Sequence, residues 1–497
     1  MFHFETQLKR LKHEVLKDVA VLAIEEKLDD ENLKSIPYKI ISGNTPTYRC
    51  CVHKERSILN ERVKLAMGCL PDGDHPKIEF IDIKDKKQIV YIIEAACDRC
   101  PINKYNVTEA CRGCIAHKCM EVCPANAMIR VAGKAYINQE LCKECGLCEK
   151  ACPYDAISEV MRPCKVSCPT GALEVREEDR RAIIEEEHCI NCGSCISACP
   201  FGAISDKSYI VPVVQELSKE DSNIYAVVAP AIAGQFGPKV TMGKVRDAFK
   251  KVGFKDIFEA ACGADAVTVH EGKEFVERME KGHKYMTNSC CPGFMNFIEK
   301  KFPDEIERVS TTVSPMIATA RFIKSKDNLA KVIFVGPCVA KKSEATRDEL
   351  KGDVDYVLTF EEIAAIMDAF SVDPENCEEQ AIDEASIFGR GFANGGGLTA
   401  AIENFIKDSN IKVDFKPVRV SGAIEIKKAM TMAKVGRLGG NFIEGMMCEG
   451  GCTGGPATLL PPMKSKGLFI KFSNEASKKS VIENDRLKEF EKINLER

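Results

Sequence analysis

The run CKECGLCEKACP at residues 142–153 returns as CINCGSCISACP at residues 189–200. Both have the spacing C-x2-C-x2-C-x3-C-P, in which three closely spaced thiolates bind one [4Fe-4S] cluster and the fourth, before proline, reaches a neighbouring cluster. A zinc ribbon needs only two C-x2-C pairs and gives no reason for the C-x3-C-P ending. The two runs therefore predict iron-sulfur clusters.

A third run lies upstream and has a longer middle spacing but the same C-P ending. Its cysteines are Cys111, Cys114, Cys119 and Cys123. Because it lies at a ferredoxin-like distance from residues 142–153, we expect the two runs to exchange their fourth ligands. One cluster would take Cys111, Cys114, Cys119 and Cys152, and the other would take Cys142, Cys145, Cys148 and Cys123.

Four cysteines of this segment remain, Cys97, Cys100, Cys164 and Cys168. They resemble the split motif of polyferredoxin subunits, in which a C-x2-C pair and a C-x3-C-P pair together partner a regular run. That resemblance implies one cluster on Cys189, Cys192, Cys195 and Cys168, and another on Cys97, Cys100, Cys164 and Cys199. Four clusters would use all sixteen cysteines, and three clusters with some idle thiols is the alternative.

Composition limits the remaining classes of function. The chain has 497 residues, 26 of them cysteine, with 45% apolar residues and 74 acidic against 70 basic side chains. This charge balance does not suggest a nucleic-acid surface. The first residues are charged rather than a signal peptide, and no run approaches the roughly 18 apolar residues of a membrane span. We expect a cytoplasmic protein without nucleic-acid or membrane partners, whose thiols bind metal.

The apolar pattern divides the chain into three expected domains. Residues 1–96 have no assigned role and include an alternating segment, 77–93, that reads as a hairpin. Residues 97–210 form the cysteine-rich segment, where folding should depend on metal. In residues 220–497 the runs YAVVAP (225–230), KVIFVG (331–336) and VDYVLT (354–359) alternate with amphipathic helices, which predicts an α/β fold with parallel strands.

Three motifs combine cysteine with glycine or proline in this last region: TNSCCPGF (287–294), GPCVAKKSEA (336–345) and EGMMCEGGCTGGP (444–456). Glycine and proline make tight turns that let the backbone approach a bulky cofactor. One thiolate from each of the first two motifs and two from the third would bind one cubane. These motifs follow strand-like runs, and chemistry in parallel sheets lies at the carboxyl ends of strands.

The three motifs occur in the order of the [FeFe]-hydrogenase signatures TSCCPxW, PCxxKxxE and ExMxCxxGCxxGG, and residues 224–456 resemble the catalytic domain of that family. The resemblance implies a two-lobed α/β H-domain with parallel or mixed sheets, preceded by ferredoxin-like α+β [4Fe-4S] modules. It also implies an H-cluster, a [4Fe-4S] cubane bridged to a diiron subsite with CO, CN and a dithiolate. The cubane ligands would be Cys291, Cys338, Cys448 and Cys452, with Cys452 as the bridge.

The resemblance further assigns a proton path and a pocket. Cys290 matches the relay thiol, and its ordinary pKa of about 8.5 suits exchange in both directions. Glu271, Glu274, Ser310 and Arg278 match the outward proton path, although the glutamates alone would read as a solvated helix face. Lys341 matches the lysine that donates to a cyanide, and Ala229, Pro230, Ala231 and Met446 match pocket residues.

Some positions depart from the signatures. Gly336 stands where common members have methionine, Phe294 replaces tryptophan, and Asn288 is inserted into TSCC. These departures indicate a divergent subgroup.

The resemblance implies reversible reduction of protons to H2, with electrons from a soluble ferredoxin passing through about four accessory clusters, and diiron-site maturation proteins as further partners. The alternatives are a hydrogen-sensing protein and an iron-sulfur carrier related to the H-domain. Carriers of this kind lack the vicinal cysteines and the PCxxK motif, and both are present here.

Overall fold

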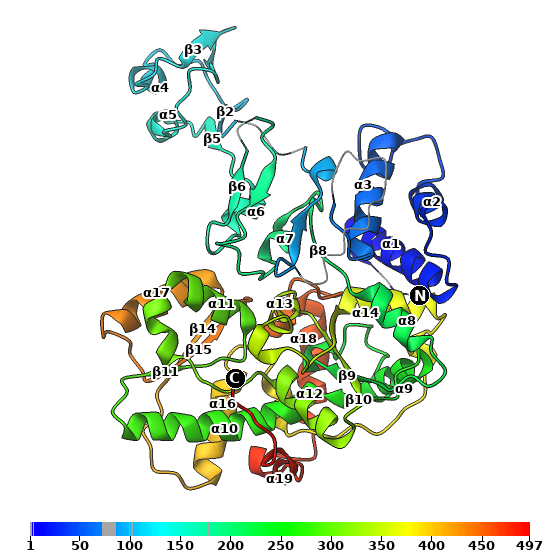
Figure 1. The fold of residues 1–497 in the computed structure, drawn as a ribbon. Helices are drawn as coiled ribbons and strands as arrows, with labels where there is room; N and C mark the ends of the chain where they lie inside the picture. The colour runs from blue at the N-terminus through cyan, green and yellow to red at the C-terminus, as the bar shows by residue number, and fades with distance from the viewer. Residues whose placement is uncertain (1, 3, 72–85, 99, 101–102, 177) are drawn as a thin grey trace.

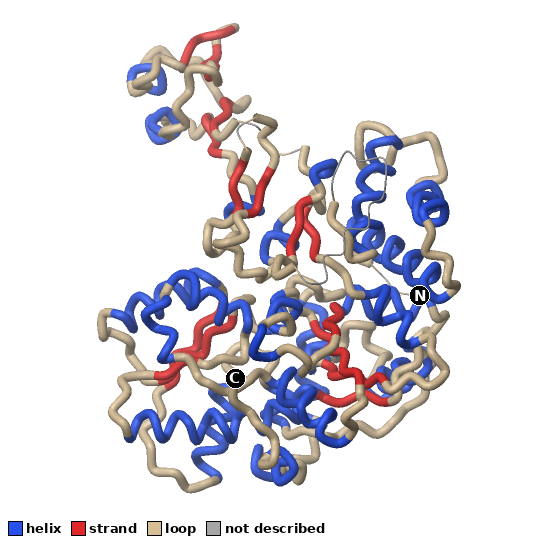
Figure 2. The backbone as a smooth tube through the Cα atoms, in the orientation of Figure 1, coloured by secondary structure: helices blue, strands red, loops and turns tan. Residues whose placement is uncertain are grey.

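The computed structural model describes residues 2, 4–71, 86–98, 100, 103–176 and 178–497. Figure 1 shows three parts: N-terminal helices, a cysteine-rich segment that extends away from the rest, and a large α/β part. Figure 2 shows that loops make up much of the cysteine-rich segment, whereas helices and strands dominate the α/β part.

The α/β part contains two sheets in which every strand pair is parallel. One sheet has the order β10-β9-β12-β13 and the other β11-β15-β14. Their strands are β9 (Ile224–Val228), β10 (Asp256–Glu259), β11 (Met286–Thr287), β12 (Lys331–Gly336), β13 (Tyr356–Thr359), β14 (Pro417–Ser421) and β15 (Phe442–Met446). The predicted parallel α/β class is confirmed, and the three apolar runs overlap β9, β12 and β13.

Helices surround both sheets, and each sheet lies in one of the two lobes of the α/β part (Figure 1). They are α8 (Ile210–Leu217), α9 (Met242–Lys251), α10 (Ala260–Glu280), α11 (Pro292–Lys301), α12 (Pro315–Lys326), α13 (Ala340–Glu344), α14 (Phe360–Ala369), α15 (Ile387–Gly391), α16 (Gly397–Asp408), α17 (Ala423–Lys434), α18 (Pro462–Asn474) and α19 (Leu487–Phe490). One of the stretches whose amphipathic pattern predicts a helix is EGKEFVERMEKG (271–282), and α10 begins well before it. Residues 260–268, the first turns of this helix, are all buried. This part of the helix therefore lacks the polar face by which a helix is recognised in a sequence.

The cysteine-rich segment is built from short hairpins and single-turn helices. Its strand pairs are β2 (Tyr105–Val107) with β5 (Ile157–Glu159), β3 (Met128–Val131) with β4 (Lys134–Ile137), and β6 (Leu173–Val175) with β7 (Ala182–Ile184), and its helices are α4 (Lys118–Glu121), α5 (Leu147–Ala151), α6 (Pro163–Val166) and α7 (Ser194–Ala198). Residues 103–160, which we call the distal module, have a small buried core of Tyr105, Met128, Ile137, Cys148 and Ile157. The expected α+β character of this segment is confirmed.

The N-terminal part consists of α1 (Gln7–Ile24), α2 (Asp30–Ile40) and α3 (Val52–Ala66). The hairpin expected at 77–93 falls partly outside the described residues, and its described end forms β1 (Val90–Ile92), which pairs antiparallel with β8 (Ile204–Asp206). The N-terminal part therefore borders both the cysteine-rich segment and the α/β part.

A buried ion network joins the three parts. The ammonium of Lys342 on α13 lies 2.8 Å from Asp206 of β8 and 2.9 Å from Glu362 of α14. Lys12 on α1 reaches Asp206 at 3.1 Å and Glu361 at 2.5 Å. Although burial alone would raise the pKa of Asp206, Lys12 and Lys342 hold it well below its usual range.

None of the described helices combines the length and the apolar character that crossing a bilayer requires.

Candidate functional site

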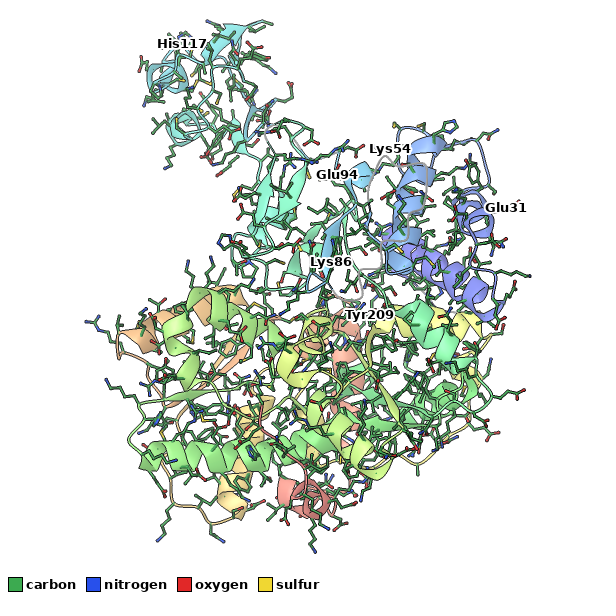
Figure 3. All side chains as sticks on the ribbon, viewed as in Figure 1. Glu31, Lys54, Lys86, Glu94, His117 and Tyr209 are labelled. Atoms are coloured by element: carbon green, nitrogen blue, oxygen red, sulfur yellow. The ribbon has the colours of Figure 1, made fainter. Side chains whose placement is uncertain are left out.

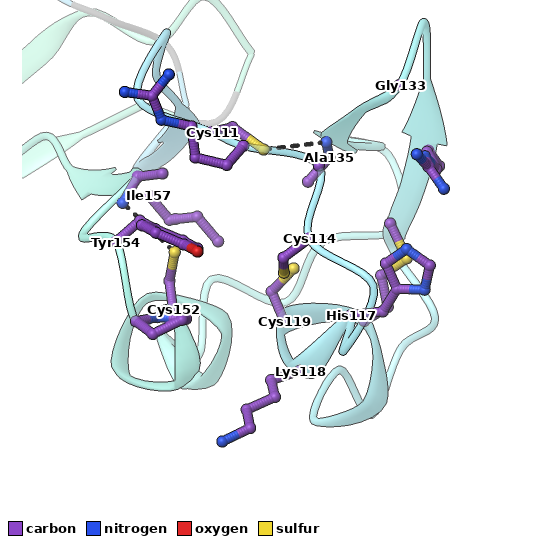
Figure 4. A pocket seen from close by; sticks show the side chains of 16 residues that line it. Cys111, Cys114, His117, Lys118, Cys119, Gly133, Ala135, Cys152, Tyr154 and Ile157 are labelled. Atoms are coloured by element: carbon purple, nitrogen blue, oxygen red, sulfur yellow. Dashed lines mark hydrogen bonds between the residues drawn. The ribbon is translucent and has the colours of Figure 1, made fainter.

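Two cysteine groups of the distal module surround separate cavities. Cys111, Cys114, Cys119 and Cys152 line one of them, which we call the distal cavity (Figure 4). Cys123, Cys142, Cys145 and Cys148 line the other. In each group the cysteine that precedes proline comes from the partner run, which is the arrangement expected for exchanged fourth ligands.

The other cysteines of the segment form two more groups. Burial and, to a smaller extent, the neighbouring thiols Cys199, Cys100 and Cys97 raise the pKa of Cys164 to about 11. Burial also raises the pKa of Cys195, and the thiols Cys192, Cys189, Cys168 and, last, Cys164 of the other set raise it too. Apart from Cys164 beside Cys195, these neighbours match the two sets expected from the sequence. We call them the Cys97 group (Cys97, Cys100, Cys164 and Cys199) and the Cys189 group (Cys168, Cys189, Cys192 and Cys195).

The spacing within these groups fits a cluster better than a single ion. Among the described residues, no three ligating side chains are close enough to hold one metal ion. Thiols arranged around an open cage instead match a multi-iron cluster, whose positive charge would ionise them.

The α/β part contains a further cavity walled by cysteines, which we call the inner cavity. About 810 Å³ between its walls is free of protein atoms. Its cysteines are Cys290, Cys291, Cys338, Cys448 and Cys452. The other described lining residues are alanine, glycine, proline, methionine and phenylalanine, apart from Lys341. An anionic cofactor would fit this apolar site with a single cation.

Strand ends bring these cysteines together. Cys290 and Cys291 follow β11, Cys338 follows β12, and Cys448 follows β15, so each lies just beyond the carboxyl end of a parallel strand. Cys452 comes after a turn in which Gly450 and Gly451 have φ of 74° and 92°. A side chain at Gly451 would lie 2.6 Å from the carbonyl oxygen of Ala393, so only glycine permits this close approach.

Burial makes the inner cysteines poor acids without a metal. It raises the pKa of Cys452 to about 12 and that of Cys448 well above the usual range. Neighbouring thiols raise the pKa of Cys338 further, while Lys341 opposes the shift. A cationic cluster at their centre is therefore needed to keep all of them ionised.

Lys341 lies on α13 with its ammonium directed to the inner cavity. Its Nζ atom is 2.6 Å from Glu344 Oε2 and donates to the carbonyl oxygen of Cys290 at 3.4 Å. Because it lines the cavity and keeps a buried carboxylate partner, Lys341 can hold an anionic ligand without being an unpaired buried charge itself.

Cys290 lines the inner cavity and is 7% exposed. Burial raises the pKa of its thiol well above the usual value, and the nearby charge of Glu271 raises it further. Asn288 opposes these effects by donating from Nδ2 to Cys290 Sγ at 3.3 Å, while its other contacts bind Gly445. The inserted asparagine therefore fixes the thiol against β15, a role that the sequence did not reveal.

Glu271 and Glu274 share one face of α10 but have different surroundings. Glu271 is fully buried, and neither carboxylate oxygen has a hydrogen-bond partner among the described residues. Burial and the charge of Glu274 raise the pKa of Glu271 well above its usual value. An unpartnered buried carboxyl group beside a thiol is an unusual feature that points to proton transfer.

Glu274 is held by polar partners nearer the surface. Ser310 Oγ donates to its Oε2 atom at 2.6 Å, and Arg278 Nη2 lies 2.6 Å from its Oε1 atom. Burial acts to raise the pKa of Glu274, but these contacts and the backbone N–H of Thr311 lower it overall. Ser310 and Arg278 thus contact Glu274 directly, whereas Glu271 lies near enough to Glu274 and Cys290 for their charges to interact.

The expected pocket residues are distributed unevenly. Ala229, Pro230 and Met446 line the inner cavity, whereas Ala231 is buried behind it. The glycine-rich segment GFANGGGLTAA (391–401), which also resembles a family segment at the pocket, lines the cavity with Phe392 and Ala393. Gly395 approaches the turn at Gly450 and Gly451, and the backbone N–H of Gly396 donates to Glu444 Oε1 at 2.7 Å.

Phe334 is a wall residue that sequence reasoning missed. A side chain at Gly336 would lie 2.5 Å from the Phe334 ring, which lines the inner cavity. The glycine that departs from the hydrogenase signature is therefore matched by a phenylalanine two residues earlier on the same strand.

The cysteine-rich segment touches the α/β part next to the inner cavity. A side chain at Gly193 would lie 2.9 Å from Pro456 and 3.2 Å from Val339, and one at Gly293 would lie 3.7 Å from Cys192. Cys192 also lies close enough to raise the pKa of Cys448. The Cys189 group is thus adjacent to the inner cavity, as electron transfer between them requires.

Comparison with known families gives separate matches for the α/β part and for the cysteine-rich segment. Residues 222–456 match the family described as "Iron only hydrogenase large subunit, C-terminal domain". Residues 158–210 match an "LdpA Fe-S cluster-binding domain" and residues 135–158 a "4Fe-4S binding domain". The cysteine-rich segment is therefore an iron-sulfur segment.

Individual relatives include hydrogenases and proteins of another class. The chain is 30% identical over 309 residues to NADP-reducing hydrogenase subunit HndD of Solidesulfovibrio fructosivorans, covering 50% of this chain and 52% of that relative. It is 30% identical over 311 residues to the periplasmic [Fe] hydrogenase large subunit of Nitratidesulfovibrio vulgaris, covering 51% and 73%. A probable cytosolic Fe-S cluster assembly factor of Aedes aegypti is 26% identical over 279 residues, covering 45% and 58%.

The chain spans about half the length of the first of these relatives. A solved [FeFe]-hydrogenase from Chlamydomonas reinhardtii is 20% identical, with a TM-score of 0.49 over 57% of this chain and 93% of that chain. From the matched domain and the coverage of the periplasmic hydrogenase subunit, the chain belongs to the iron-only, or [FeFe]-, hydrogenase family.

Proposed function

We propose that the protein is a hydrogenase that catalyses the reversible reduction of protons to H2. The observation that carries this proposal is the series from Glu274 through the unpartnered Glu271 to Cys290 at the wall of the inner cavity. A protein that only stores or carries a cluster needs four thiolates. It has no use for a buried carboxyl group and a further thiol, whose burial costs free energy.

Cys291, Cys338, Cys448 and Cys452 would hold the cubane of an H-cluster, with Cys452 as the bridge to a diiron subsite. That group would supply the iron centre at which hydrogen is formed or split. Lys341 would donate to an anionic ligand of the subsite, and its pairing with Glu344 keeps its ammonium in place. Ala229, Pro230 and Met446 would exclude water from the same space.

Protons would move between solvent and the inner cavity along the side chains of α10. Glu274, exposed enough to exchange with water, would pass a proton by way of Ser310 to Glu271. Because the pKa of Glu271 is raised, this carboxyl group would hold the proton at neutral pH and exchange it with Cys290. Arg278 would keep Glu274 oriented through the ion pair at 2.6 Å.

Electrons would enter through the cysteine-rich segment. Four accessory clusters on the sets named above would lead to the Cys189 group, next to the inner cavity. We infer that a soluble ferredoxin is the external partner, since basic side chains line the distal cavity and Ile115, next to Cys114 in the sequence, is exposed. Reduced thiols and clusters fit the cytoplasm, where maturation proteins would insert the diiron subsite.

The second candidate is an iron-sulfur assembly or carrier function, favoured by the similarity to cytosolic assembly factors. The test is expression of the full chain with and without the diiron-site maturation proteins, followed by infrared spectroscopy and a hydrogen assay. A hydrogenase gives bands of bound CO and CN⁻ and evolves H2 only when those proteins are present. If the purified chain shows [4Fe-4S] signals alone in both preparations, the carrier function replaces the hydrogenase proposal.

A Cys290→Ala variant separates chemistry from assembly. It should keep the CO and CN⁻ bands and lose hydrogen evolution by a factor of about 10²–10⁴, the usual contribution of a proton-transfer group. Wild-type activity in this variant would refute the relay.

A further inference from the structure

Two arginines of the N-terminal part reach toward the Cys97 group. Arg62 on α3 is 6% exposed, and its Nη2 atom donates to the carbonyl oxygen of Gly202. Arg49, just before α3, donates from Nη2 to the carbonyl oxygens of Ala96 and Phe201, at 3.3 Å each. Figure 3 labels Lys54 of α3 and Glu94, which lies three residues before Cys97.

The accepting carbonyl groups belong to peptides that border the cluster ligands. Gly202 shares a peptide unit with the N–H of Ala203, which donates to Cys199 Sγ at 3.3 Å. A cation at one end of this peptide therefore polarises the N–H that faces the sulfur. The carbonyl group of Ala96 belongs to the peptide that leads into Cys97, whose N–H donates to the carbonyl oxygen of Glu94, so Arg49 would act on this cluster through its charge alone.

Neither arginine has a carboxylate partner among the described residues. Glu361, the nearest carboxylate to affect Arg62, pairs with Lys12, and Glu55 accepts the backbone N–H groups of Thr47, Tyr48 and Arg49. Burial lowers the pKa of Arg62, and Tyr48 and Cys199 oppose that shift. An arginine stays protonated in proteins, so a buried positive charge lies near Cys199 of the Cys97 group.

The contact depends on a glycine. Gly202 has a φ of 60°, and a side chain there would lie 2.3 Å from Leu8 and 2.5 Å from Arg62 Nη2. The guanidinium thus reaches this peptide only because position 202 has no side chain.

We propose that Arg62 and Arg49 are positioning residues that raise the reduction potential of the cluster held by Cys97, Cys100, Cys164 and Cys199, and that this is a function of the N-terminal part. The step is the transfer of one electron from a reduced one-electron carrier, by way of the distal module, to this cluster. No bond forms or breaks, and the cluster gains one negative charge. A nearby cation and a stronger N–H to sulfur hydrogen bond both favour the more negative state.

The inference rests on the cluster ligands named under the proposed function, but not on hydrogen chemistry. The test is therefore a potentiometric titration followed by electron paramagnetic resonance, on full-length protein made without the diiron-site maturation proteins. A Cys199→Ser variant identifies the signal of the Cys97 group, because that signal alone should change its line shape.

Arg62→Gln keeps a hydrogen-bond donor and removes the charge. We expect the ratio of reduced to oxidised cluster at a fixed potential to fall at least tenfold, which corresponds to a 59 mV lower potential for one electron. Arg49→Gln, which is less buried, should give a smaller shift in the same direction, and Arg62→Lys should stay near wild type.

Arg56→Gln is the matched control, since Arg56 lies on the same helix but donates to the carbonyl oxygen of Ile41. It should leave the potential unchanged. An unchanged potential in Arg62→Gln and Arg49→Gln at full iron content, or an equal shift in Arg56→Gln, would overturn the proposal. If Arg62→Gln does not fold, Arg49→Gln and its direction of shift decide the question.

Discussion

The distal cavity and the inner cavity are both walled by cysteines, but the protein builds them in different ways. The inner cavity lies at the ends of parallel strands with a large apolar core behind them. The distal cavity lies among loops, over a core of five buried residues. The first can keep its shape without a cofactor, whereas the second needs one to fold. Under the proposed function, hydrogen chemistry would take place in the cavity that has the large apolar core, and electrons would enter at the one that depends on metal.

The largest expected effect comes from withholding iron. Without clusters, residues 103–160 should unfold, because five buried residues cannot offset the entropy of ordering the segment. The α/β part should keep its fold. Amide hydrogen exchange on iron-free protein measures this directly: full exchange is expected in the distal module and protection in β9, β12 and β15. Equal protection in both regions would contradict the comparison.

The next largest effect is expected from replacing Glu271, the buried carboxyl group near the inner cavity. Glu271→Gln cannot exchange a proton and should reduce hydrogen evolution by about 10²–10⁴-fold. Glu277→Gln is the control, since Glu277 is exposed on the same helix beside Lys281. Hydrogen evolution with a reduced dye checks both, and unchanged infrared bands would show that assembly is intact. Normal turnover in Glu271→Gln would exclude it from the proton path.

Charge changes around the distal cavity should have a smaller effect, and only on the reaction with a protein partner. Arg112 and Lys118 line it, and nearby Ile115 is 95% exposed. Changing either cation to glutamate should raise the KM for an acidic ferredoxin severalfold, consistent with less than about 1 kcal/mol per exposed charge. Activity with a small dye should not change, and the effect should shrink at high salt. A loss with dye as well would mean that the cluster itself was damaged.

The smallest effects concern packing. Ile333→Val in the centre of the four-stranded sheet should lower the unfolding free energy of iron-free protein by about 0.5–1.5 kcal/mol. Ile157→Val in the distal module should leave that transition unchanged, because the module is already unfolded without iron. In iron-loaded protein, Ile157→Val should instead speed cluster loss. Chemical denaturation and the rate of iron release distinguish the two.

Much of this architecture could be predicted from the sequence, because its signals are local. The cysteine spacings specify which thiols gather, and the runs at 225–230, 331–336 and 354–359 overlap buried parallel strands. The beginning of α10 was not visible, since residues 260–268 are buried all round. Hydrophobic periodicity reports a helix only where one face meets water.

Contacts between residues that are far apart in the sequence could not be predicted. Asn288 could be seen as an insertion, but not as the donor to Cys290 that also binds Gly445. Phe334 is an ordinary strand residue in the sequence, and only the structure shows that its ring lies against Gly336. Arg49 and Arg62 have no local signal, because nothing in their neighbourhood of the sequence indicates the peptides that they contact.

The ion network of Lys342, Asp206, Glu362 and Lys12 limits how this protein can be shortened. A minimal hydrogenase cut from the α/β part would lose Asp206, and a version without the N-terminal helices would lose Lys12. Removing one partner from a buried pair costs about 3–5 kcal/mol, which is a large fraction of the stability of a typical domain. Each part thus supplies charges that the others need, and the three are expected to be inherited and engineered as one unit.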